Sequence, residues 1–223
     1  MKKLIFSAFA IIFAFGVHAG QYPSNIIGVR GGLNVSTMNR RLALEDGGYL
    51  SLNDNRRAKV GWNVGIVDQI LLLDMTPLYL EPGLYLTNKG SGYRLKNGDV
   101  KNIKRLGVTY LQIPVNVSYH IYAGNFTIQP RVGIYYALGL WARDISIVKA
   151  DGKIDKTIVN PYDGGNTLMG RSDFGMQVGL GGTYMEHYYF GIEWETGFVN
   201  MSKVTSRKDT NISNFKIEFG YNF

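Results

Sequence analysis

The chain of 223 residues contains no cysteine. Disulfides, thiolate metal sites and thiol redox chemistry are therefore excluded, as is a lipoprotein anchored through a cysteine thiol. Long apolar runs are also scarce. The one helix-length apolar stretch, residues 4–17, is shorter than the roughly 20 residues that a spanning helix needs. An inner-membrane helical protein is therefore excluded as well.

The N-terminus has the pattern of an export signal. Lys2 and Lys3 precede the apolar stretch, and Val17, His18 and Ala19 supply a small-residue cleavage site. This predicts a cleaved secretory signal peptide at residues 1–19 and one mature domain at residues 20–223. An uncleaved N-terminal membrane anchor is the alternative interpretation.

The last nine residues alternate strictly between apolar and polar side chains. The apolar set is Phe215, Ile217, Phe219, Tyr221 and Phe223. A period of two with one apolar face predicts a half-buried strand, and an exported chain that ends this way favours the closing strand of a transmembrane barrel.

Similar alternation predicts eight strands in the mature chain. They are residues 26–35, 60–71, 77–87, 106–122, 126–141, 172–184, 188–199 and 215–223. Short turns are expected at 72–76, 123–125 and 185–187, and long connections at 36–59, 88–105, 143–171 and 200–211. We therefore predict an all-β fold: an eight-stranded antiparallel up-and-down barrel in the bacterial outer membrane, with short periplasmic turns and four long extracellular loops.

Closure follows from the backbone, because an open sheet edge in hydrocarbon leaves N–H and C=O groups without partners. One residue breaks the pattern. Asp68 falls on the apolar phase of the second strand, so we expect a bulge there or an earlier strand end.

The basic residues separate from the apolar faces. Of 22 lysines and arginines in the mature chain, 19 fall in the four long connections, and the other three lie on polar strand faces. A basic side chain at the membrane midplane costs about 2–4 kcal/mol, so a membrane would impose this separation. A secreted soluble β-sandwich, the competing fold, has no reason for it.

Eight strands enclose an interior that side chains fill. The expected interior charge network is Arg30, Glu81, Arg131, Asp173, Glu193, Glu195, Lys216 and Glu218. Buried charges need opposite partners, so we interpret this set as a packed structural core, with an ion path or gated plug as the alternative.

No catalytic site, cofactor or metal site is expected. Glu193 and Glu195 share a strand face as a glycosidase pair could, but carboxylates two residues apart are common in polar barrel cores. Ser118 neighbours His120 as in a lipid hydrolase, but no third member of a triad is evident. The sequence contains neither a phosphate-binding loop nor metal-ligand spacing. We therefore expect a protein that is not an enzyme.

Connection 88–105 is the most basic of the four. Lipopolysaccharide phosphates are the expected partner of its cations, by charge attraction, and a solvated loop without a ligand is the alternative. An exported membrane protein rarely meets nucleic acid, so none is expected as a partner. The cations are Lys89, Arg94, Lys96, Lys101, Lys104 and Arg105.

Five segments resemble the outer-membrane β-barrel family of Bacteroidota that includes the PorT-type proteins. They are GVRGGLNVS at 28–36, LEPGLYLTNKG at 80–90, YLQIPVNVSY at 110–119, VGLGGTY at 178–184 and the terminal FKIEFGYNF. The resemblance implies an eight-stranded barrel inserted by the outer-membrane assembly machinery, which would read Phe215, Ile217, Phe219, Tyr221 and Phe223 as its signal. We expect a structural or surface-binding role through the loops, with a PorT-like role in type 9 secretion beside an unknown protein partner as the alternative. A lipid-modifying enzyme or a small ion channel is less favoured.

Overall fold

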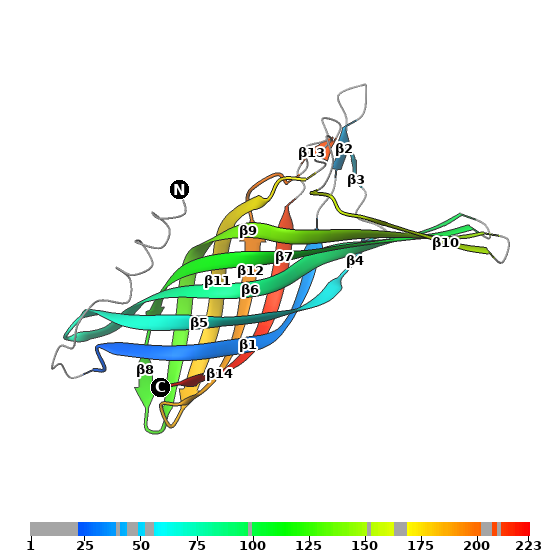
Figure 1. The fold of residues 1–223 in the computed structure, drawn as a ribbon. Coiled ribbons are helices and arrows are strands. Elements are labelled where there is room, and N and C mark those ends of the chain that lie inside the picture. Colours follow the sequence, from blue (N-terminus) through cyan, green and yellow to red (C-terminus); the bar gives the residue numbers. More distant parts are fainter. Residues whose placement is uncertain are drawn as a thin grey trace.

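The computed structural model describes residues 22–38, 41–43, 49–51, 56–97, 100–150, 153–162, 169–201, 207–208 and 211–223. Eight long strands form a closed antiparallel ring (Figure 1). Around the ring they are β1 (Asn25–Met38), β5 (Lys59–Leu73), β6 (Thr76–Asn97), β7 (Val100–Tyr119), β9 (Phe126–Ala150), β11 (Ser172–Tyr184), β12 (Tyr188–Gly197) and β14 (Ile212–Asn222). The predicted barrel is confirmed.

Ring closure is a complete ladder between the first and last long strands. β1 pairs with β14 from Gly28 opposite Asn222 to Met38 opposite Ile212. No backbone edge is left open along this seam, which is what a barrel in hydrocarbon requires.

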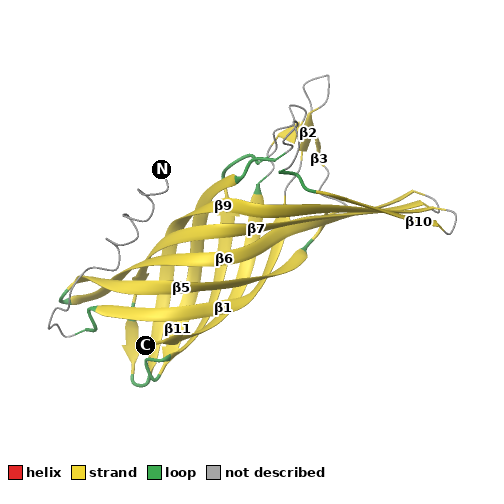
Figure 2. Ribbon diagram, viewed as in Figure 1, coloured by secondary structure: helices red, strands yellow, loops and turns green. Residues whose placement is uncertain are grey.

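Short strands complete the description. They are β2 (Arg41–Ala43), β3 (Tyr49–Ser51), β4 (Arg56–Arg57), β8 (Ile121–Ala123), β10 (Lys153–Val159) and β13 (Arg207–Lys208). β13, β2 and β3 form a separate small sheet. The ribbon coloured by type shows strands and loops throughout the described residues (Figure 2). Among these residues no helix is long and apolar enough to cross a membrane.

The alternation predicted from the sequence sorts side chains into the two faces of the wall. On β1, Val29 and Leu33 are exposed on the outside, whereas Arg30 and Asn34 are buried inside. β12 repeats this, with Phe190 and Trp194 outside and Glu193 inside. An outer surface of exposed aliphatic and aromatic side chains is the surface that a lipid bilayer covers.

One end of the barrel, here called the short-turn end, carries the tight turns that the sequence predicted. They fall at Asp74–Met75, Gly124–Asn125 and 185–187. In the last turn Met185 and Glu186 both have positive φ, 51° and 64°. That is the geometry of a type I′ hairpin turn, which favours asparagine and glycine.

At the opposite end, the long-loop end, two predicted loops are strands instead. Connection 88–105 is a hairpin in which β6 and β7 stay paired as far as Asn97 opposite Val100. β9 continues to Ala150 and pairs with β10, so a narrow sheet projects from the barrel beyond the label of β4 (Figure 1). These strands lose their alternation because water reaches both faces once they leave the barrel wall.

The expectation for Asp68 is wrong. β5 neither ends at Asp68 nor bulges there, because Asp68 pairs with Ile27 in regular register and the one irregularity lies at Leu71/Leu73. The first residue of β1 supplies a polar partner instead. Asn25 Nδ2 donates to Asp68 Oδ2 at 3.4 Å, and the carboxylate is fully buried.

Candidate functional site

The middle of the lumen holds a network of ion pairs centred on Arg131. Its guanidinium contacts three carboxylates, with N–O distances of 3.4 Å to Glu81, 2.9 Å to Glu193 and 3.1 Å to Glu218. It also donates to the hydroxyl of Tyr189. All these side chains are buried, so the low dielectric strengthens each attraction and also makes any unpaired charge costly.

Lys216 extends the network along β14 and β12. Its ammonium lies 2.5 Å from Glu193 and 2.8 Å from Glu195, and the strand register places Lys216 directly opposite Glu193. Lys89 approaches Glu195 from the other side, at 2.6 Å. Glu195 is therefore held between two ammonium groups.

Glycine makes room for the central pair. Gly179 lies opposite both Arg131 and Glu193 on the neighbouring strands. A Cβ at this position would come within 3.0 Å of Arg131 Nε and 3.2 Å of Glu193 Cβ. The absence of a side chain at Gly179 thus lets the guanidinium lie against the wall of the barrel.

The other two predicted network residues are buried in the lumen but make different contacts. The guanidinium of Arg30 lies 3.7 Å from the ring centroid of Tyr189, a cation–π contact. Asp173 accepts a hydrogen bond of 3.1 Å from the hydroxyl of Tyr135. All eight predicted interior charges therefore lie in the lumen, and six of them form the ion-paired cluster.

An apolar cluster, the outer cap, covers this network at the long-loop end. Tyr110 donates from its hydroxyl to Met201 Sδ at 3.2 Å, and Tyr162 reaches in from the connection after β10. Its members are Met38, Leu106, Val108, Tyr110, Tyr135, Ala137, Ala142, Tyr162, Met169, Met201 and Ile212. Apolar side chains above ion pairs leave water little polar surface to follow through the lumen.

Two catalytic alternatives from the sequence lie in the packed interior. Ser118 Oγ is 3.4 Å from His120 Nε2, but both side chains are buried, and His120 stacks on Tyr79. Glu193 and Glu195 are both engaged by lysine or arginine. His120 lines a cavity of about 540 Å³ at the short-turn end, but Ser118 is not among the described residues that line it, nor is either glutamate.

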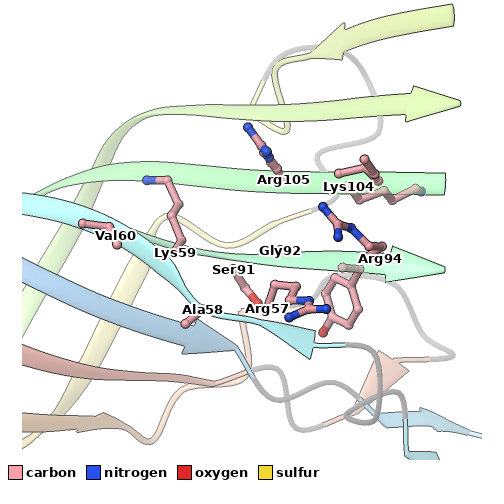
Figure 3. Close-up of a pocket in the computed structure, with 11 residues that line it drawn as sticks. Arg57, Ala58, Lys59, Val60, Ser91, Gly92, Arg94, Lys104 and Arg105 are labelled. Carbon is pink, nitrogen blue, oxygen red and sulfur yellow. The ribbon is translucent and has the colours of Figure 1, made fainter. Parts of the chain in front are cut away.

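A strongly basic concave surface lies at the long-loop end, between β4, the start of β5 and the β6–β7 hairpin. We call it the basic groove. It has a volume of about 470 Å³, and no acidic residue is among the described residues that line it. The lining residues, most of them labelled in Figure 3, are Arg57, Ala58, Lys59, Val60, Ser91, Gly92, Tyr93, Arg94, Ile103, Lys104 and Arg105.

Two facing glycines leave room for the side chain of Lys59, which lines the groove. Gly90 and Gly107 are paired across β6 and β7, and a Cβ at either would crowd the side chain of Lys59, coming within 2.9 Å of Cδ from Gly90 and 3.1 Å of Nζ from Gly107. The Lys59 ammonium donates to Asn88 Oδ1. The chain therefore fixes the ammonium of Lys59, while Arg57, Arg94 and Arg105 are exposed nearby on one face of the sheet.

The predicted lipopolysaccharide-binding set is only partly correct in its placement. Lys89 is wrong, because it lies 1% exposed inside the lumen with Glu195 as its partner. Arg94, Lys104 and Arg105 line the basic groove. Lys96 and Lys101 face each other in the hairpin, and their side chains lie outside the described residues. Arg57 and Lys59 were missed as members of this site, since they belong to a different connection.

The predicted assembly-signal residues form one outward face of β14. Phe215, Ile217, Phe219 and Tyr221 are exposed on the lipid side, and Phe223 continues the row beyond the strand end. Phe223 N donates to Ile27 O at 2.8 Å, which ties the last residue to β1. The predicted signal peptide at residues 1–19 lies outside the described residues.

No protein-family model and no curated protein matches the chain. Solved structures similar to it are outer-membrane barrels. OprG of Pseudomonas aeruginosa is 15% identical over 92% of this chain and 98% of its own, with a TM-score of 0.48. Neisserial surface protein A is 11% identical over 88% and 97%, with a TM-score of 0.41. The outer-membrane enzyme PagL is 11% identical over 88% and 97%, with a TM-score of 0.44.

Proposed function

We propose that the protein is a non-conducting, non-catalytic barrel of the bacterial outer membrane that acts by binding at its outer surface. The membrane location is supported by the apolar outer wall and by the export signal of the sequence. With short turns on the periplasmic side, the long-loop end faces the outside of the cell.

The observation that carries the proposal is the filling of the lumen. The Arg131 cluster occupies its middle, and the outer cap covers that cluster at the long-loop end. An ion would have to displace buried ion pairs and pass apolar side chains, which is expensive in a low-dielectric interior. Binding groups instead gather on the outside, where the strands leave the membrane.

Planar-bilayer recording tests the closed lumen. Purified, refolded protein should insert without stepwise conductance above the leak of the bare bilayer. The matched control is the same protein with Arg131→Ala and Tyr110→Ala, which opens the middle and the cap together. Stable ohmic steps from the unmodified protein would overturn the proposal, and steps from the control alone would support it.

The projecting sheet favours a second candidate, a PorT-like component of protein secretion. β10 is the last strand of the sheet order, and within the described part of the chain it pairs only with β9; it exposes Ile154, Ile158 and Val159. An exposed apolar edge strand is a surface to which another chain can add a strand. Deletion of residues 145–158 should then abolish secretion of cargo while the barrel still reaches the membrane. Unchanged secretion would reject this candidate.

A further inference from the structure

We propose that the basic groove binds the phosphate groups of a membrane glycolipid of the lipid A class. This rests on the proposed function and specifies its ligand. Five basic residues and no acidic one are among the described residues that line this concavity of about 470 Å³. Like charges repel, so holding them together raises the energy of the empty groove, and an anion with several charges offsets that repulsion.

The donors suit phosphate rather than a single carboxylate. Three of the five cations are arginines, whose planar guanidinium can bind two phosphate oxygens at once. Arg57 of β4 and Arg105 of β7 both pair with Gly92, so they lie on one face of the sheet. Arg94, two residues further along β6, shares that face. Lys59 supplies a fourth charge, and Asn88 Oδ1 already fixes its ammonium. Donors on several sides of one space match an anion with oxygens pointing in several directions.

The position of the groove selects a membrane lipid as the source of that phosphate. Val60 lines the groove, and it also begins the row of exposed apolar side chains on β5 that continues with Trp62, Val64 and Ile66. The groove therefore begins at the edge of the apolar wall. Phosphates attached to a lipid lie at this level, beside the aromatic girdle of a barrel, whereas a soluble anion has no reason to be held there.

The position of Lys59 in the groove is built into the fold. A β-hairpin with ordinary side chains at positions 90 and 107 would displace the side chain of Lys59. Because these two glycines are partners across β6 and β7, both strands leave space for Lys59 at the same level of the hairpin. The remaining cations project from the rim, so a headgroup can enter without rearrangement of the barrel.

Native mass spectrometry of the detergent-folded protein, titrated with lipid A bearing two, one or no phosphates, tests the inference. The bisphosphorylated lipid should bind best and the unphosphorylated lipid should not bind measurably. Arg94→Gln with Arg105→Gln should weaken binding by about tenfold or more, because each removes a charge-assisted hydrogen bond. The charge-matched control, Lys149→Gln with Lys156→Gln, alters exposed positions outside the groove and should leave binding unchanged.

The source of the phosphate is decided by competition with inositol hexakisphosphate. Failure of this soluble polyphosphate to displace lipid A supports the glycolipid assignment. Displacement that the groove variant abolishes would overturn it in favour of a soluble polyanion. Equal weakening by the groove and control variants would overturn the site itself. None of these results depends on conductance. The proposal of a closed, non-conducting lumen is therefore tested separately from the proposal of lipid A binding.

Discussion

Arg131 Nε and Glu193 Oε2 lie 2.9 Å apart against Gly179, the residue that pairs with both of them across the sheet. β11 lies between the strands of the two partners and has no side chain at Gly179. The ion pair occupies the space that a side chain there would fill. Substitution of a glycine here should act on electrostatics and packing together.

Gly179→Ala should destabilise the barrel by about 1–3 kcal/mol, the usual cost of overpacking a filled interior. The new methyl group would meet Ile192 O at 2.7 Å as well as the ion pair. Gly182→Ala is the control on the same strand, because a Cβ there meets its nearest atom, Thr127 O, at 3.4 Å. Urea unfolding in detergent micelles measures both. Equal midpoints for the two variants would contradict the role assigned to Gly179.

Arg131→Met should destabilise the barrel by about 3–5 kcal/mol, because three carboxylates lose their shared cation. Adding Glu81→Gln and Glu218→Gln to this variant should recover part of the loss by removing the uncompensated charges. The order of stability of the unmodified protein, the single variant and the triple variant is measured on gels. Samples are heated in steps, and the temperature at which the folded band disappears is recorded for each protein. If the triple variant is the least stable, charge pairing does not govern the network.

Lys89→Met and Arg94→Met separate the lumen from the groove. Lys89 contacts Glu195 and lies 4.5 Å from the ring centroid of Tyr135, so its loss should cost about 3 kcal/mol without changing lipid A affinity. Arg94 is exposed on the hairpin, so its loss should weaken lipid A binding and leave the unfolding midpoint within about 0.5 kcal/mol. If Lys89→Met instead weakened lipid A binding without loss of stability, Lys89 would belong to the lipid A site and not to the lumen.

Glu186→Gly should stabilise the protein by about 1 kcal/mol, because glycine adopts a φ of 64° without the steric cost that glutamate bears. The hydrogen bond from Asn222 Nδ2 to Glu186 O uses the backbone and survives the change. Glu186→Ala keeps the strained φ and should give no comparable gain. An alanine variant as stable as the glycine variant would mean that the carboxylate, not the backbone, is responsible.

Deletion of Phe223 should lower the amount of folded barrel in the outer membrane. The deletion removes the last ring of the outward row, just beyond β14, and the hydrogen bond to Ile27 O. Fractionation of cells that express the two forms at equal levels measures the effect, and refolding in detergent separates recognition from stability. Normal insertion in cells would reject the signal role of this residue.

Alternation alone predicted which face of each long strand is buried, because membrane and lumen impose opposite chemistry on neighbouring residues. The same parity on β6 would have placed Lys89 inside with Glu81, had the strand not been ended at residue 87. Charge and glycine content made 88–105 resemble a loop, although backbone pairing continues there. The basic groove could not be predicted, because it depends on the pairing of Arg57 with Gly92. That pairing is set by the tilt of the strands and their stagger, which a single sequence does not reveal.

β6, β7 and β9 run without a break from the barrel wall to the end of the projecting sheet. Because these strands are continuous, there is no hinge between the projecting sheet and the barrel wall. A force applied to a partner bound near Asn97 or Ala150 is therefore transmitted to the same strands that hold Glu81 and Arg131. Mechanical load on the outside of the cell would reach the ion pairs of the lumen directly, so a pulled barrel should fail from its centre.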